Sequence, residues 1–185
     1  MLQDLDKTIE ELLKCELLPD LATQVTISFA PPNKEFLKSL PAISLFLYDV
    51  RENLDLRSNE WSLERSSNGT AMKKRPPARV DCSYLITAWS NDAADFQTEH
   101  KLLGEVMKVL LRYRQLPEAV LQGSLAQQEP PIRTAILRPN LLQSLGEFWQ
   151  AIGGTPKAAL NYTVTIAVSV DEAAESVPLV VSKTI

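Results

Sequence analysis

The side chains best suited to acid–base, nucleophilic or metal chemistry are scarce in this chain of 185 residues. It has a single histidine, His100, and two cysteines, Cys15 and Cys82. A zinc site needs several such ligands at close spacing, and these three are far apart in the sequence. We therefore expect no metal, no cofactor and two reduced, unreactive thiols.

Carboxylates are more numerous, but their spacing does not indicate catalysis. The pairs Asp4/Asp6 and Glu10/Glu11 fall on the polar side of an expected helix, which is not the arrangement of a glycosidase pair. Glu52 has no second base or metal cluster beside it in the sequence. Because there is also no Gly-rich phosphate loop and no G-x-S-x-G motif, we expect that this protein is not an enzyme.

Composition and charge exclude further classes. Hydrophobic residues make up 45% and charged residues 23% of the chain, as in ordinary globular proteins. The net charge of −4 argues against general nucleic-acid binding, which usually requires a basic excess. The longest apolar run, residues 42–48, is too short to cross a bilayer, and no secretory signal is visible. We therefore expect a cytoplasmic location and no membrane insertion.

One basic cluster stands out in this acidic protein: Lys73, Lys74 and Arg75, with Arg79 close behind. One interpretation is a loop that docks on an acidic partner and speeds association. The other is the solvated tip of a hairpin, where charges contribute little to stability.

The last fifteen residues differ from the rest. They begin acidic and end in an apolar, β-branched segment that includes Val177, Leu179, Val180 and Val181. Such a segment can add as a strand to the sheet of another subunit, because open edges accept extended chains. It can also fold back on its own sheet, or fray as termini often do.

Hydrophobic periodicity predicts the elements that position these residues. Apolar residues at three- and four-residue steps predict helices at 2–18, about 93–114 and about 140–152. Alternating or densely apolar segments predict strands at 25–29, 42–57, 79–89, 132–137 and 160–170. Residues 58–79 are polar and rich in turn residues, so we expect strands 42–57 and 79–89 to pair antiparallel across them. Arg51, Glu52 and Asn53 follow an apolar strand and are expected to hold a turn or an intersubunit contact.

The elements together indicate an α+β fold: a single domain with a mainly antiparallel sheet and helices packed on one face. We place this domain at residues 1–170, followed by a C-terminal extension at 171–185.

Three stretches, in this order, resemble the cap or tail-terminator proteins of phage-tail-like contractile injection systems. The first is Pro41–Asn53 with Leu56-Arg57. The second contains Pro76-Pro77, Asp81, Tyr84–Trp89, Glu99–Gly104 and Met107. The third contains Leu137–Pro139, Leu145, Trp149 and Leu160–Tyr162. Residues 155–159 are more bland than the corresponding segment in that family.

The resemblance implies a structural protein without catalysis. Family members form a homohexameric ring on the end of the inner tube and sheath distal to the baseplate, where the ring stops polymerisation and fixes particle length. The expected partners are other copies of this chain, the sheath protein and the inner tube protein. A tail terminator of a contractile phage, at the head–tail junction, is the alternative.

Overall fold

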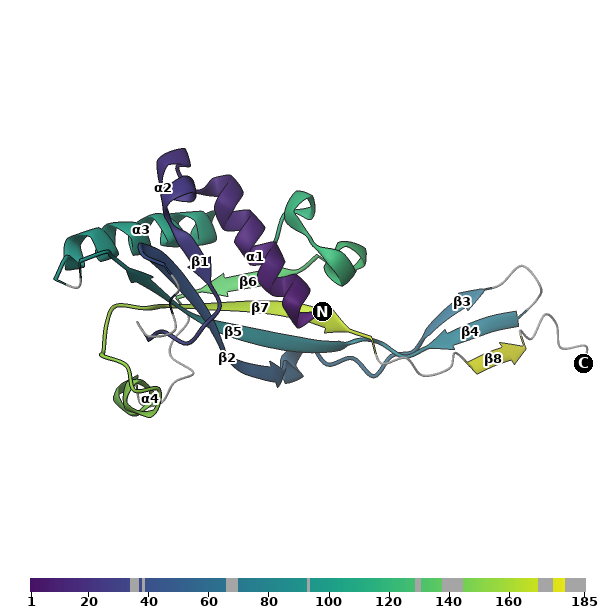
Figure 1. Ribbon diagram of the computed structural model, residues 1–185. Helices are drawn as coiled ribbons and strands as arrows, with labels where there is room; N and C mark the ends of the chain where they lie inside the picture. Colours follow the sequence, from purple (N-terminus) through teal and green to yellow (C-terminus); the bar gives the residue numbers. More distant parts are fainter. Residues whose placement is uncertain are drawn as a thin grey trace, which may run out of the picture.

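The computed structural model describes residues 1–33, 37, 39–65, 70–92, 94–128, 131–137, 145–169 and 175–178. These residues form a five-stranded sheet, which we call the body, and a three-stranded sheet that projects from one end of it, which we call the arm (Figure 1). The body strands are β1 (Thr26–Ser28), β2 (Ala42–Glu52), β5 (Ala78–Trp89), β6 (Arg133–Ile136) and β7 (Leu160–Val168). The arm strands are β3 (Ser62–Arg65), β4 (Thr70–Lys74) and β8 (Glu175–Pro178).

The predicted α+β class and the antiparallel pairing of β2 with β5 are confirmed. The body order is β1-β2-β5-β7-β6, and every pair except the parallel β1/β2 is antiparallel. The β2/β5 register runs from Ala42 opposite Trp89 to Glu52 opposite Val80. β2 is shorter than predicted because Asn53 turns the chain into the 3₁₀ helix η2 (Leu54–Leu56). The arm was predicted only as a loop with one short strand.

Within the described ranges, four α-helices and two further 3₁₀ helices accompany the sheets. They are α1 (Leu2–Glu16), α2 (Pro19–Gln24), α3 (Phe96–Arg112), α4 (Leu145–Ala151), η3 (Glu118–Val120) and η4 (Gly123–Gln127). Pro19 begins α2 as well as following α1, since proline is well placed in a first helical turn. Among the described residues, no helix is both long enough and apolar enough to span a bilayer.

The core lies between one face of the body sheet and helices α1 and α3. Leu5, Ile9 and Leu12 of α1 are spaced so that they share one face, and all are fully buried. Alternate residues of the central strands, such as Ile86 and Val164, point into the same cluster.

The sequence predicted that all helices pack on one face of the sheet, but the structure has helices on both faces. α1, α2 and α3 lie on one side of the body sheet and α4 on the other (Figure 1). Phe148 of α4 places its ring 6.4 Å from that of Phe46 and 6.2 Å from that of Tyr48, both on β2. The aromatic contacts give α4 an anchorage separate from the main core.

One polar contact fastens α1 to the middle of the sheet. The hydroxyl of Tyr84, a fully buried residue of β5, donates a hydrogen bond of 2.8 Å to Asp6. Partial burial raises the pKa of Asp6 above its ordinary value, although the bond from Tyr84 opposes the shift. The folded chain therefore binds this proton more tightly than the unfolded chain. The stabilisation that results is greatest at acid pH and is lost as pH rises through the raised pKa.

Asp6→Asn keeps an oxygen that accepts from Tyr84 and removes the desolvated charge. We expect the variant to be more stable than the parent at pH 7, by up to about 1 kcal/mol because solvent screens a half-buried group. At about pH 3 the parent carboxyl is neutral in both states, so the difference should vanish. Urea unfolding at both pH values measures this, with Asp55→Asn on the exposed η2 turn as control. A variant that is less stable than the parent at pH 7 would contradict the prediction.

Candidate functional site

The arm is the most distinctive surface feature of the molecule. β4 lies at its centre, with β3 and β8 as edge strands (Figure 1). β8 comes from the C-terminal extension, and it pairs antiparallel with β4, far away in the sequence. An edge strand presents backbone groups along its outer side, so an arm of this kind is suited to binding an extended chain.

Of the four residues predicted to make a strand contact, the structure describes Val177 alone. Val177 lies in β8, and its backbone is opposite Ala71 of β4 in the same chain. Leu179, Val180 and Val181 lie outside the described residues. Pro178 ends β8 opposite Thr70. The contact with another subunit stays a prediction.

The basic cluster does not lie at a hairpin tip. Lys73 and Lys74 are the last residues of β4, at the end that leads back to the body. Arg75 follows as an exposed residue, and Arg79 lies in β5. The cluster is therefore at the junction between arm and body, because the hairpin turns at the opposite end of β4. A docking role for these four residues stays a prediction.

Arg51, Glu52 and Asn53 make local contacts where β2 ends. The Arg51 guanidinium forms a two-point ion pair with Asp49 at 2.6 and 2.9 Å. Glu52 pairs with Arg57 beyond η2. Neighbouring charges raise the pKa of Arg51 and lower that of Glu52.

Asn53 holds the turn itself. Its Oδ1 accepts a 3.1 Å bond from the amide of Leu56, and its Nδ2 donates a 3.0 Å bond to Asp81. The Asn53 amide also donates to the carbonyl of Arg79. These bonds fix the geometry of the turn, and an additional intersubunit role stays a prediction.

A groove opens beside this turn, where residues 57–61 and 75–77 join body and arm. We call these residues the neck. The groove has a volume of about 470 Å³ and is lined by Trp61, Arg75, Pro76 and Pro77 among others. Trp61, which lines the groove, is exposed, and so are Val50 near the end of β2 and Leu54 and Leu56 of η2. Exposed large apolar side chains, where they form a continuous patch, are typical of surfaces that contact another protein.

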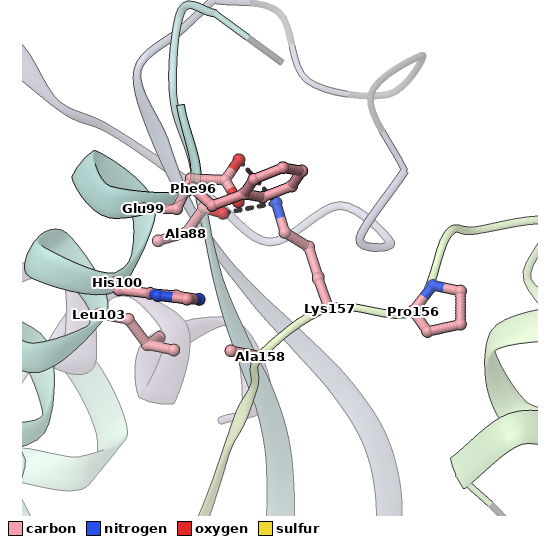
Figure 2. A pocket seen from close by; sticks show the side chains of 8 residues that line it. All are labelled: Ala88, Phe96, Glu99, His100, Leu103, Pro156, Lys157 and Ala158. Carbon is pink, nitrogen blue, oxygen red and sulfur yellow. Dashed lines mark hydrogen bonds and ion pairs between the residues drawn. The ribbon is translucent and has the colours of Figure 1, made fainter. Parts of the chain in front are cut away.

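A second group of polar residues lies at the opposite end of β5 (Figure 2). The Lys157 ammonium is 2.9 Å from a carboxylate oxygen of Glu99 and donates a 2.7 Å bond to the Ala88 carbonyl. It also lies 3.6 Å from the centre of the Trp89 ring. Glu99 is buried and accepts a bond from the Ser90 amide. This arrangement fixes the loop before β7 to α3 and the end of β5.

The pocket beside this ion pair does not assemble catalytic groups. It has a volume of about 90 Å³, and Figure 2 shows His100 on its wall, alongside Leu103 and Phe96. Both Lys157 and Glu99 are used in their mutual pair. Within the described ranges there is no group of three or more histidine, cysteine or acidic residues that could hold a metal ion.

Neither cysteine is activated as a nucleophile. Cys82 is buried in the core, and desolvation with nearby acids raises its pKa to about 12. Cys15 is exposed, and desolvation with Glu11 nearby raises its pKa as well. Both side chains are therefore thiols rather than thiolates at neutral pH.

Sequence reasoning missed two side chains whose contacts matter in this structure. One is Lys157, in the segment that looked bland. A single charge between Pro156 and Ala158 was the available sign of a buried ion pair. The other is Gln128, which binds the backbone of Ala167 through two hydrogen bonds. A glutamine in a loop gives no sequence sign of such a role.

Comparison with known proteins defines the class. The sequence matches the family model of the Pvc16 N-terminal domain over residues 4–183, so the chain belongs to this family. The predicted resemblance to contractile injection system terminators is thereby confirmed. No curated protein sequence matches the chain.

Two solved structures are similar over the whole chain. One is the sheath/tube terminator of PVC, an extracellular contractile injection system, in its extended state. It has a TM-score of 0.72 and 30% identity, with 100% of this chain and 63% of that chain covered. The other is the tube-terminating cap of the anti-feeding prophage, with a TM-score of 0.69, 29% identity and coverage of 100% and 61%. The chain thus spans less than two thirds of the length of these proteins.

Lys157→Met removes the cation and leaves Glu99 buried without its ion-pair partner. We expect the free energy of unfolding to fall by about 3 kcal/mol, because the Glu99 carboxylate would stay buried with no positive charge to compensate its lost hydration. Lys101→Met, on the exposed side of α3, is the matched control and should change stability by less than about 0.5 kcal/mol. Urea unfolding measures both. Equal stability of the two variants would show that the pair is not structurally important.

Proposed function

We propose that this chain is a structural assembly protein of a contractile injection system. In this proposal six copies form a ring that caps the inner tube and the sheath at the end distal to the baseplate. The ring stops further addition of subunits and thereby fixes particle length. The single observation that carries the proposal is similarity over the entire chain to a protein described as a sheath/tube terminator.

Features of the described residues support a binding role over a catalytic one. Edge strands in the arm, the exposed Trp61 at the neck and a basic cluster between arm and body are all suited to protein contacts. One of the two similar structures is described as part of an extracellular contractile injection system, which favours an injection particle over a true phage tail.

We infer that the arm makes the contact with sheath or with the neighbouring cap subunit. Val177 and the following Leu179, Val180 and Val181 would add as a strand in this contact. Backbone hydrogen bonds supply affinity in such strand additions, and side chains supply specificity. Lys73, Lys74, Arg75 and Arg79 would dock on an acidic rim of tube or sheath, with Arg51–Asn53 available to a neighbouring subunit. This division of labour corresponds to a cap domain at 1–170 and a contact-making extension at 171–185.

We further infer that the protein acts in the cytoplasm, where the particle is assembled. The finished particle would then be released or attached to a membrane. The role needs no cofactor and no nucleic acid.

Removing the chain from a producing cell tests the proposed function directly. Without a cap, tubes and sheaths should lose their uniform length, because no subunit blocks the growing end. Electron microscopy of purified particles measures the length distribution, and complementation with the intact chain is the control. Particles of normal, uniform length in the absence of the chain would refute the proposal.

Deletion of residues 172–185 tests the contact made by the extension. We expect co-sedimentation with purified sheath to fall about tenfold or more, since several backbone hydrogen bonds contribute about 1 kcal/mol each. A chain in which residues 179–185 are replaced by a Gly-Ser segment of equal length separates loss of strand pairing from loss of bulk. Lys183→Ala, which keeps the apolar residues, is the control. Undiminished binding by the deleted chain would exclude the extension as the contact.

A further inference from the structure

The hydrogen-bond ladder between β6 and β7 stops before β7 ends. β6 pairs with β7 from Ile136 opposite Tyr162 to Arg133 opposite Thr165. In an antiparallel pair every second residue exchanges both backbone bonds with its partner, and the 3.0 Å bond from the Leu137 amide to the Asn161 carbonyl sets this alternation. By the same count Ala167 is the next residue of β7 that faces the β6 side, and Pro131 stands opposite it. Proline has no amide hydrogen, so β6 cannot continue the ladder there.

The side chain of Gln128 takes the place that Pro131 leaves. Its Nε2 donates a 2.7 Å bond to the carbonyl of Ala167, and its Oε1 accepts a 3.0 Å bond from the Ala167 amide. A side-chain amide carries one carbonyl and an NH₂ group in a single plane, as the backbone does. Gln128 therefore reproduces both bonds that a neighbouring strand would make with Ala167.

The outer side of β6 is closed by backbone. The Thr134 amide donates a 2.9 Å bond to the Arg114 carbonyl, and the Leu116 amide donates a 2.9 Å bond to the Ile132 carbonyl. Gln115 bridges Arg133 between them. Among the described residues of β7, Ala167 is a position where the backbone groups on this side are paired by one side chain.

A groove runs past this position. It has a volume of about 830 Å³, and Gln128 lines it together with Leu116, Leu121, Pro131 and Ile132. Without Gln128, the Ala167 peptide groups would be unpaired beside a groove with several apolar residues, which is an arrangement that can bind an extended chain by strand addition. The groove makes the loss of Gln128 consequential, because an incoming strand would gain apolar contacts as well as backbone bonds.

We propose that Gln128 is an edge-closing residue. Its side-chain amide makes both hydrogen bonds that the backbone of Ala167 could offer to a neighbouring strand. A strand from a second copy of this chain is therefore kept out of the groove. The inference deepens the proposed cap function and rests on it for its purpose: a cap whose body edge stayed open would nucleate the growth that it should stop. The closing contact itself is a property of the isolated chain.

Gln128→Ala in the purified full-length chain tests the inference. Loss of both bonds should speed hydrogen exchange of the Ala167 amide about tenfold, as expected for one hydrogen-bonded group that opens locally. In sedimentation velocity the variant should form species larger than those of the parent that keep growing with concentration. Gln127→Ala, on the exposed neighbouring position of η4, should match the parent in both measurements.

Gln128→Lys separates edge closure from damage to the fold. It removes the same two bonds but places a charge at the edge, which blocks strand addition. We expect fast exchange at Ala167 without the larger species. Gln128→Met, which removes both bonds without adding a charge and keeps a side chain of similar length, replaces Gln128→Ala if circular dichroism shows the latter unfolded.

Two results would overturn the inference. One is unchanged protection of the Ala167 amide when Gln128 is replaced. The other is fast exchange at Ala167 in the uncharged variant Gln128→Ala without any increase in association over the parent. Neither measurement involves tube or sheath, so a failure of the cap function in cells would be distinguishable from a failure of this inference.

Discussion

The structure depends on where backbone hydrogen-bonding groups at sheet edges are satisfied and where they are offered. In the body, β6 covers β7 as far as Thr165, the 114–116 segment covers β6, and Gln128 binds Ala167. In the arm, β3 and β8 are edge strands. Because an unpaired peptide group is costly when buried and adhesive when exposed, the contacts along β7 and β6 disfavour strand addition on that side of the body.

The arm repeats the order of the strands from which it grows. β2, β5 and β7 are neighbours in the body, and each is continuous in sequence with one arm strand: β2 leads to β3, β4 leads to β5, and β7 leads to β8. The order β3-β4-β8 in the arm therefore corresponds to the order β2-β5-β7 in the body. Leu45 of β2, Tyr84 of β5 and Val164 of β7 all belong to the core, so the arm extends from three strands that are anchored in it.

The sequence was informative wherever periodicity dominates. Buried strands such as β5 and β7, and helices with a regular apolar stripe such as α1, were predicted within a few residues. The arm was missed because residues 58–79 lack apolar alternation, and its third strand comes from the other end of the chain. The side of the sheet occupied by α4 was also missed, since an apolar stripe shows that a helix packs but not on which face.

The candidate site was less predictable than the fold because its contacts join distant segments. The Glu99–Lys157 pair and the Gln128–Ala167 pair each link residues far apart in sequence. Individually, a glutamine or a lysine carries no pattern that names its partner. Only the basic cluster and the apolar extension were visible as local composition, and the structure relocated the first of these from a hairpin tip to the junction of arm and body.

Strand addition has an inherent weakness as a means of assembly, since the backbone is the same in every protein and main-chain bonds alone do not select a partner. Selection then requires that the wrong edges be closed as well as that the right one be open. Pro131 has no amide hydrogen with which to continue the ladder on β7, and a side-chain amide supplies both a donor and an acceptor in one planar group. A carboxylate in the same place would accept from the Ala167 amide but could not donate to the Ala167 carbonyl. If the chain caps a polymer as proposed, closing this position by Gln128 removes one site at which a further strand could add.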